Sequence, residues 1–362
     1  MESPLKPPLE ARKGRGALTN DKTRFEARQL EPVDDGWGGP PEAQPEFVTQ
    51  VSAEPCRTII SHNDSPDVPF EQSINPYRGC EHGCVYCFAR PSHAYLNLSP
   101  GLDFETRLFF KARAAELLEK ELGRPSYKVK PIALGTNTDP YQPIERRLKV
   151  TRSILEVFVR YRHPCTIVTK GTLIERDLDL LDDLARDRLV SVMVSVTTLD
   201  DELKRVMEPR AAAPLARLKI IERLATRGIP VGALMAPVVP AINDHEIEKV
   251  VEAVAAHGAK SAGFVMLRLP HELKTLFREW LEAHFPLKAE HVLSLIRDMR
   301  GGRENDPRFG SRMRGEGGVA ELIGQRFKLA AKRAGLDRDR RTELELKAFR
   351  VPPPHSPQLA LF

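Results

Sequence analysis

Short apolar segments alternate with amphipathic stretches between residues 70 and 270, and this alternation constrains the fold more than any other feature of the chain. The segments are almost continuously apolar, which is typical of strands that are buried on both faces of a parallel sheet. A strand followed by a helical stretch, repeated along the chain, predicts βαβ units. The expected apolar strands are VKPIALGT (129–136), CTIVTK (165–170), VSVMVSV (190–196), IPVGALMAP (229–237) and SAGFVMLRL (261–269). A further short extended piece, FEQSIN (70–75), precedes them and is the sixth expected strand.

The stretches between these strands carry apolar residues at helical spacing, and six strands are too few for a complete eight-stranded barrel. The sequence therefore predicts an α/β fold that forms a partial (β/α)6 barrel or a strongly curved open sheet. In either form, ligands bind at the carboxyl ends of the strands. The expected helices span residues 105–122, 146–161, 213–228 and 244–258.

The remainder of the chain differs in composition from this central region. Residues 1–50 are rich in proline, glycine and charge, and they bury too little apolar surface to offset the entropy of ordering, so we expect a disordered arm. Residues 51–270 form the expected barrel domain, and residues 271–350 are interpreted as a mainly helical extension beside it. Residues 351–362 are interpreted as a proline-rich tether with an apolar end.

Composition and charge narrow the class of protein. The hydrophobic content of 41% and charged content of 29% are those of a soluble globular protein. No run of about 18 apolar residues is present, and the first residues lack a signal-peptide pattern, so we expect a cytoplasmic protein without a membrane segment. The net charge of +5 is compatible with a nucleic-acid partner but does not require one.

Three of the five cysteines, Cys80, Cys84 and Cys87, lie within eight positions in the segment RGCEHGCVYCFARP. The odd count and a reducing compartment favour a metal site over disulfides. A structural zinc site needs four ligands, and His82 or His93 could supply the fourth. The other interpretation is a cubane iron–sulfur cluster held by three thiolates, which leaves one iron open for chemistry.

Tyr86 stands directly before the last cysteine, and the C-x3-C-x2-C motif then resembles the signature of the radical S-adenosylmethionine (radical SAM) superfamily. The resemblance implies that Cys80, Cys84 and Cys87 bind a [4Fe-4S] cluster whose open iron binds S-adenosylmethionine. It also implies reductive cleavage of S-adenosylmethionine to methionine and a 5′-deoxyadenosyl radical, which abstracts a hydrogen atom. The position of the motif after the first strand of a six-strand βα array strengthens the resemblance.

Polar residues follow the other expected strands, where a bound cofactor would lie. Each has a plain structural interpretation as well, since Asp139 precedes a proline as in many turns and Arg210 suits a solvated surface. The phrases NPYRGCEHGCVYCFAR, TNTDPYQPIE, TKG, MEPRAAAP and APVVPAINDHE resemble the spore photoproduct lyase-like branch of the superfamily, which is often labelled DNA repair photolyase.

This resemblance places the backbone of Tyr86 near the adenine of S-adenosylmethionine. It implies that Lys170 or Arg210 binds the methionyl carboxylate, a pairing that charge-assisted hydrogen bonding favours. The full set of cofactor-binding residues that we expect is Tyr86, Thr138, Asp139, Lys170, Ser195 and Arg210.

The chain departs from the lyase at Thr136. The lyase carries a cysteine at this place, the end of the second strand, and that cysteine returns a hydrogen atom to the product radical. The O–H bond of threonine is too strong for a convenient hydrogen donor, so the sequence does not predict repair of thymine photoproducts by the same route. Two cysteines remain. Cys165 begins the third strand, at the end away from the expected site, and Cys56 lies in a segment upstream of the first strand, so the catalytic residue stays unassigned.

Two features near the C-terminus bear on partners. A glycine-rich loop carries six arginines, which could bind phosphate groups; the alternative is a solvated loop without a ligand. The arginines are Arg297, Arg300, Arg303, Arg308, Arg312 and Arg314. The last residues resemble the pentapeptide by which bacterial replication and repair proteins dock onto the sliding clamp; the alternative is that they fold back onto the domain. The residues of this peptide are Gln358, Leu359, Leu361 and Phe362.

The sequence thus predicts a radical SAM enzyme that acts on DNA or RNA and receives electrons from a donor such as flavodoxin or ferredoxin. The second hypothesis is the same radical chemistry on a peptide, a protein or a small metabolite. The third is a zinc-stabilised nucleic-acid-binding adaptor without enzymatic activity.

Overall fold

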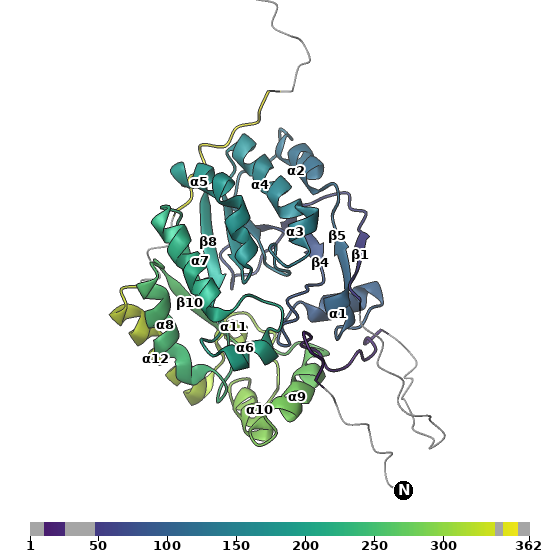
Figure 1. Ribbon diagram of the computed structural model, residues 1–362, viewed down its shortest axis with the longest axis vertical. Helices are drawn as coiled ribbons and strands as arrows, with labels where there is room; N and C mark the ends of the chain where they lie inside the picture. The colour runs from purple at the N-terminus through teal and green to yellow at the C-terminus, as the bar shows by residue number, and fades with distance from the viewer. Residues whose placement is uncertain (1–10, 26–47, 337–342, 354–362) are drawn as a thin grey trace, which may run out of the picture.

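The computed structural model describes residues 11–25, 48–336 and 343–353 (Figure 1). Its main sheet has seven strands in the order β10-β9-β8-β7-β6-β3-β2, and every neighbouring pair is parallel except β2 with β3. The strands span Ser61–His62 (β2), Gln72–Ile74 (β3), Ile132–Leu134 (β6), Cys165–Thr169 (β7), Val190–Ser195 (β8), Val231–Val238 (β9) and Ala262–Met266 (β10).

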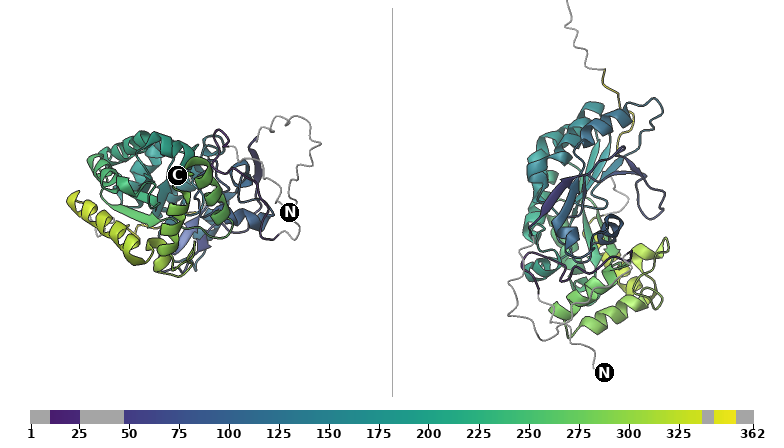
Figure 2. Two further views of the ribbon diagram at one scale, coloured as in Figure 1. Left: turned by 90° about the horizontal axis from the view of Figure 1, so that it is seen from below. Right: turned by 90° about the vertical axis from the view of Figure 1, so that its right-hand side faces the viewer.

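The six parallel strands are those that the sequence predicts, so the α/β fold with a partial (β/α)6 barrel is confirmed. Cys165 pairs with Val190, and Ser195 pairs with Leu234, so the carboxyl ends of the strands meet at one edge of the sheet. Helices line the outer side of the curved sheet (Figure 2). They are α2 (Ala114–Leu122), α4 (Val150–Tyr161), α5 (Leu178–Arg186), α7 (Pro214–Thr226) and α8 (Ile247–Ala256).

The core forms between this sheet and its helices. Val192 of β8 and Ile154 and Phe158 of α4 have no exposed surface, and the two α4 residues lie one helical turn apart. Burying an apolar side chain of this size contributes roughly 1.5–3 kcal/mol. Short helices occupy several of the connections: η1 (Arg90–Leu96), α3 (Glu145–Leu148), η2 (Thr172–Asp177), α6 (Asp201–Met207) and η3 (Asp244–Glu246).

The C-terminal region is helical, as the sequence predicts, as far as Arg333. Its last helix lies against α8, where Arg326 and Glu248 form an ion pair at 2.7 Å. Residues 343–353 contain no helix; they form a turn at residues 346–348 and contact the barrel through Glu345 and Arg350, whose N–H groups donate to the carbonyls of Arg188 and Tyr161. The helices are α9 (Leu273–His284), α10 (Ala289–Asp298), α11 (Ser311–Arg314) and α12 (Gly317–Arg333).

The single helix expected over residues 105–122 is wrong. This stretch ends α1 (Asp103–Thr106), continues as strand β5 (Arg107–Phe110) and only then enters α2. Strand β5 pairs with β1 (Gln50–Ala53) and β4 (Tyr77–Arg78) in a second, three-stranded sheet. A short apolar run fits a strand and a helix equally well, and pairing with distant segments decides between them.

The expectation of a disordered arm does not hold for residues 11–25, which pack on the protein. The backbone N–H groups of Gly16 and Ala17 donate to the carboxylate of Glu105 at 3.1 and 2.9 Å, and Leu18 is buried. Composition alone missed this because the partner lies far along the chain. The rest of the predicted arm and the predicted clamp-docking peptide lie outside the described residues.

None of the described helices has both the length and the apolar character needed to cross a membrane.

Candidate active site

The three clustered cysteines lie on a loop between β4 and η1. Gly79 and Gly83 of this loop have φ angles of +75° and +68°, a backbone conformation that favours glycine. The N–H of Cys80 donates to the carbonyl of Phe104 at 2.9 Å, which fixes the start of the loop. The loop holds Cys80 and Cys84 almost completely buried and Cys87 partly exposed.

Arg90 holds the closed shape of the loop. This side chain has no exposed surface, and it forms an ion pair with the equally buried carboxylate of Glu105. Arg90 Nε donates to the carbonyl of Cys84 at 2.8 Å, and Nη2 donates to the carbonyl of Gly83 at 3.1 Å. Nη1 donates to the carbonyls of Pro100 and Gly101 at 3.1 and 2.9 Å.

The three thiols are protonated at neutral pH when no metal is bound. Burial raises the pKa of Cys84 to about 12 and also raises the pKa values of Cys80 and Cys87. Iron binds the thiolate, so metal loading must displace these protons.

The donor set fits an iron–sulfur cluster better than a zinc ion. His82 Nδ1 faces the carboxylate of Asp139 at 3.4 Å, and His93 Nε2 lies 2.9 Å from the carbonyl of Arg107, so one ring nitrogen of each histidine is engaged. The arrangement of the cysteines, rather than these histidine contacts, distinguishes the two kinds of site. In the described part of the chain, no three Cys, His or carboxylate side chains converge as ligands of one metal ion. Three cysteines that each bind a different iron of a cubane need not converge on one point.

Asp139, which follows β6, joins the ends of two strands. Its carboxylate accepts hydrogen bonds from the Thr169 hydroxyl and the Lys170 N–H, both at 2.7 Å, and from the Tyr141 N–H at 2.8 Å. Burial alone would raise the pKa of Asp139, but the facing His82 and these hydrogen bonds lower it to about 2. Asp139 is therefore a carboxylate at neutral pH.

Thr138 and Thr136 are also engaged with protein partners. The Thr138 hydroxyl donates to the carbonyl of Tyr77 at 2.9 Å and is buried. The Thr136 hydroxyl accepts from the side-chain amide of Asn75 at 3.2 Å. The lyase-like resemblance places a hydrogen-donating cysteine at position 136. In this chain the position carries Thr136, whose hydroxyl is hydrogen-bonded to Asn75.

Tyr86 belongs to a buried polar network. Its hydroxyl donates to Glu208, which also accepts from Thr197 at 2.8 Å and pairs with Arg217. Burial alone would raise the pKa of Glu208, but Arg217, the Lys170 ammonium group and these hydrogen bonds lower it to about 2. Arg217 also donates to the carbonyl of Ser195 at 3.1 Å, so one ion pair connects the cysteine loop to the end of β8.

Lys170 and Arg210 differ in their electrostatic partners. Arg210 pairs with Glu81 of the cysteine loop at 3.1 Å, and its N–H donates to the carbonyl of His82 at 3.2 Å. The Lys170 ammonium group lies 5.8 Å from the centre of the Tyr86 ring. Among the described residues, no carboxylate lies within ion-pair distance of it. Lys170 is therefore the cation at this edge that is better placed to receive an anionic ligand.

A pocket of about 390 Å³ opens beside these residues, at the carboxyl edge of the sheet. It is lined by His82, Tyr141, Pro143, Arg146, Gly171, Thr172, Leu173, Arg210, Ala211 and Ala212. Three of these side chains carry or can carry positive charge, so the pocket suits an anionic or polar group.

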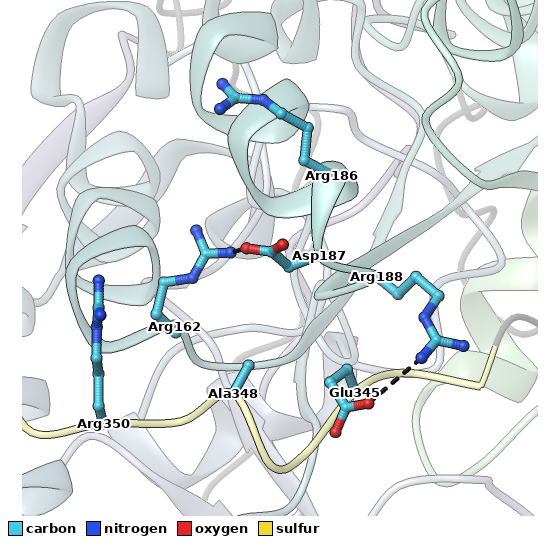
Figure 3. Close-up of a pocket in the computed structure, with 7 residues that line it drawn as sticks. All are labelled: Arg162, Arg186, Asp187, Arg188, Glu345, Ala348 and Arg350. Atoms are coloured by element: carbon cyan, nitrogen blue, oxygen red, sulfur yellow. Dashed lines mark hydrogen bonds and ion pairs between the residues drawn. The ribbon is translucent and has the colours of Figure 1, made fainter.

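A second pocket, of about 550 Å³, lies at the opposite end of the barrel, where β7 and β8 begin (Figure 3). Arg188 pairs with Glu345 at 3.3 Å across it, and Arg162 pairs with Asp187. The pocket thus marks the place where residues 343–353 are fixed to the base of the barrel. Its lining residues are Arg162, Arg186, Asp187, Arg188, Glu345, Ala348 and Arg350.

The comparison with protein families decides between iron–sulfur and zinc chemistry. The radical SAM superfamily model matches residues 74–254, which is half of the 362-residue chain and includes all three clustered cysteines. The chain belongs to the radical SAM superfamily. It is a radical SAM enzyme, and its cofactors are a [4Fe-4S] cluster and S-adenosylmethionine.

Relatives of this radical SAM enzyme occur in distant organisms. An uncharacterised protein of Mycobacterium tuberculosis is 37% identical over 245 residues, 67% of this chain and 72% of the relative. An uncharacterised protein of Methanocaldococcus jannaschii is 27% identical over 220 residues, 60% of this chain and 78% of the relative. The structure of a spore photoproduct lyase mutant matches with a TM-score of 0.56 and 16% identity over 79% of both chains, which shows a shared fold.

Several residues that shape the site of this radical SAM enzyme were missed by sequence reasoning. Glu105 lies in a stretch expected to be plain helix, and Arg90 and Arg217 look like ordinary surface arginines in the sequence. Each is buried and binds the cysteine loop or a strand end. Only Arg90 had a feature in the sequence that could have drawn attention to it, namely its place in CFARP, three residues after Cys87. That spacing does not show what the side chain binds.

Proposed function

We propose that this enzyme cleaves S-adenosylmethionine reductively and uses the resulting radical on a nucleic acid. The observation that carries the proposal is the set of three thiols on one loop, two of them almost completely buried, closed by Arg90 and placed beside Lys170. Among the described residues, no carboxylate lies within ion-pair distance of the Lys170 ammonium group. The likeness to spore photoproduct lyase supports the substrate class, since a structure of that lyase is complexed with a dinucleoside spore photoproduct. That match has a TM-score of 0.56 and covers 78% of both chains.

Each residue has a defined part in the proposal. Cys80, Cys84 and Cys87 hold the cluster as thiolates, and Arg90 keeps their loop closed against solvent. When bound and reduced, the cluster with S-adenosylmethionine supplies a 5′-deoxyadenosyl radical, which is the hydrogen-abstracting species. Lys170 binds the methionyl carboxylate, because a free ammonium group beside the loop lowers the energy of that anion.

The remaining expected residues support this arrangement. Asp139 holds the backbone of Lys170, and Thr138 fixes the chain beside the cysteine loop. Tyr86 presents its backbone to the adenine while its hydroxyl is held by Glu208. Ser195 at the end of β8 lines the cofactor site, and Arg210 lies at its rim, paired with Glu81.

Thr136 separates the proposed reaction from that of the lyase. A threonine O–H is a poor hydrogen-atom donor, and this hydroxyl already pairs with Asn75. In this enzyme, the hydrogen atom that returns to the product radical therefore comes from a group other than a cysteine at the end of the second barrel strand.

The proposal is tested by anaerobic reconstitution with iron and sulfide, followed by reduction with dithionite. S-adenosylmethionine is added with DNA oligonucleotides, RNA oligonucleotides or a peptide pool, and 5′-deoxyadenosine is measured by mass spectrometry. We expect about four iron and four sulfide per chain and faster 5′-deoxyadenosine formation with a nucleic acid. The Cys84→Ala variant should lose the cluster and the cleavage. Stimulation by the peptide pool alone would refute the nucleic-acid substrate, and one zinc without iron would refute the chemistry.

Two protein partners belong to the proposal. The enzyme needs a one-electron donor, for which a flavodoxin or ferredoxin is suited. The C-terminal peptide Gln358–Phe362 docks on a sliding clamp, which would bring the enzyme to DNA. Deletion of residues 358–362 should abolish capture by a purified bacterial clamp and leave S-adenosylmethionine cleavage intact; undiminished capture would refute the docking.

A further inference from the structure

Arg268 occupies an unusual place at the carboxyl edge of the sheet. It follows the end of β10 by two residues, and its guanidinium carbon lies 4.9 Å from the centre of the Phe88 ring. Phe88 directly follows Cys87 in the chain and is 45% exposed. Arg268 therefore lies against the loop that holds the cluster, on a surface that a substrate can reach.

Arg300 builds the wall behind Arg268. It is 2% exposed, and its Nη2 donates to the carbonyl of Leu267 at 2.7 Å. Its Nη1 donates to the carbonyls of Ser311 and Arg312 at 3.0 and 2.9 Å. One buried arginine thus joins the end of β10 to the glycine-rich loop and fixes both beside Arg268.

The same loop brings a third positive charge. Arg312 forms an ion pair with Asp67 and donates to the hydroxyl of Ser65. Arg268 thus lies near two like charges, Arg300 and Arg312, and near one carboxylate, Asp67, which Arg312 already binds. Arg300 is also close to Asp306 and Glu316. Burial and the two like charges lower the pKa of Arg268 to about 10, so it stays charged at neutral pH.

Among residues 11–25, 48–336 and 343–353, no carboxylate lies within ion-pair distance of Arg268. In the part of the chain that the structure describes, the polar atom that its Nη1 contacts is the thioether sulfur of Met313, at 3.3 Å. A thioether is a weak acceptor and carries no charge. Three arginines of the neighbouring loop show the contrast, because each pairs with an acid: Arg297 with Glu290, Arg308 with Asp306 and Arg312 with Asp67.

We propose that Arg268 binds a phosphodiester group of the nucleic-acid substrate, while the exposed ring of Phe88 stacks on an adjoining base. The planar guanidinium donates two parallel hydrogen bonds to phosphate, and its stacking on Phe88 holds it ready to do so. Aromatic rings beside basic groups are the usual means of holding single-stranded nucleic acids. This inference rests on the proposed function and names the contact that positions the substrate.

The test uses the reconstituted, cluster-containing enzyme with fluorescein-labelled 12-nucleotide single strands of DNA and of RNA, and the dinucleotide TpT as competitor. Binding is measured by anisotropy across a range of salt concentrations. Four proteins are compared: wild type, Arg268→Gln, Arg268→Lys, and Arg350→Gln, which removes the same charge at the opposite end of the barrel. Urea unfolding of each protein reports whether the variant is folded.

We expect Arg268→Gln to weaken binding by about tenfold or more, the effect of losing a hydrogen-bonded charge. The slope of log K against log salt is negative, and its magnitude should decrease by about 0.7, the value for one phosphate contact on a single strand. Arg268→Lys should restore the slope but not the full affinity, because it lacks the planar fork. Arg350→Gln should bind as wild type. The difference between DNA and RNA shows which polymer supplies the phosphate.

Two outcomes would overturn the inference, and they can be told apart. Wild-type enzyme that binds neither polymer refutes the proposed nucleic-acid substrate and this contact with it. Wild-type enzyme that binds, together with a folded Arg268→Gln variant of unchanged affinity and salt slope, refutes the role of Arg268 alone. Equal losses in Arg268→Gln and Arg350→Gln would also refute it, because they would show an effect of overall charge.

Discussion

Arg90 and Glu105 form an ion pair in which neither side chain has any exposed surface. The pair joins three parts of the chain, because Arg90 binds the carbonyls of the cysteine loop and Glu105 binds the N–H groups of Gly16 and Ala17. The pair thereby ties the cysteine loop to residues 16–17.

Glu105→Ala should destabilise the protein by about 3–5 kcal/mol, because it leaves the buried guanidinium of Arg90 without a counter-charge. Urea unfolding of the apoprotein measures the loss, and iron content after reconstitution should fall with it. The control is Glu116→Ala, which removes a solvent-exposed pair with Arg113 and should change the free energy of unfolding little. Equal effects of the two substitutions would contradict a structural role for the buried pair.

Gly16→Ala should detach residues 11–25 from the cysteine loop. A Cβ atom at Gly16 would lie 1.8 Å from the carbonyl oxygen of Gly83, and backbone cannot move aside cheaply. Limited trypsin digestion should then cut faster after Arg15 and Arg24, and the cluster should bleach faster in air. The control is Gly318→Ala, where no atom lies within 4 Å of the added Cβ. Unchanged digestion and bleaching of Gly16→Ala would show that the segment does not shield the loop.

His163 should make the protein less stable in mild acid. Its Nδ1 lies 2.9 Å from the carbonyl of Pro164, so Nδ1 carries the proton of the neutral ring and Nε2 accepts from the Tyr127 hydroxyl at 2.7 Å. Burial lowers its pKa from 6.5 to about 4. Above pH 6.5 the ring is neutral in both the folded and the unfolded state. As the pH falls toward 4, the imidazole binds a proton in the unfolded chain but not in the folded protein. The free energy of unfolding therefore decreases, by about 3 kcal/mol at pH 4.

His163→Gln should flatten this part of the pH–stability curve, measured by urea unfolding of the apoprotein. At pH 8 the imidazole is neutral in both states, so the difference between variant and wild type there reports only lost contacts. A variant that keeps the full slope between pH 6.5 and 4 would assign the acid sensitivity to other groups.

The sequence predicts the parts of this protein that depend on local pattern. Five of the six parallel strands follow from nearly continuous apolar runs, and the sixth, β3, follows from the short extended piece FEQSIN (70–75). The spacing of Cys80, Cys84 and Cys87 predicts the radical SAM family, to which the chain belongs. What it does not predict depends on partners far apart in the chain. Strand β5 pairs with β1 more than fifty residues earlier, and Glu105 holds Gly16 across 89 positions. The sequence does not single out Arg268. Its lack of a carboxylate partner among the described residues is seen only in the structure, where residues 65–67, 87–88, 267–268 and 300–313 lie close together.

Lys170→Met should weaken binding of S-adenosylmethionine by about tenfold or more, whereas Arg210→Met should weaken it less. The reason is that Arg210 is already paired with Glu81 at 3.1 Å, and among the described residues Lys170 has no carboxylate partner. Calorimetric titration of the oxidised, cluster-containing enzyme measures both affinities, and iron analysis confirms equal cluster content. Lys219→Met, on the exposed side of α7, is the control for loss of charge. If Arg210→Met shows the larger loss, Arg210 must break its pair with Glu81 to bind the methionyl carboxylate, and the assignment passes from Lys170 to Arg210.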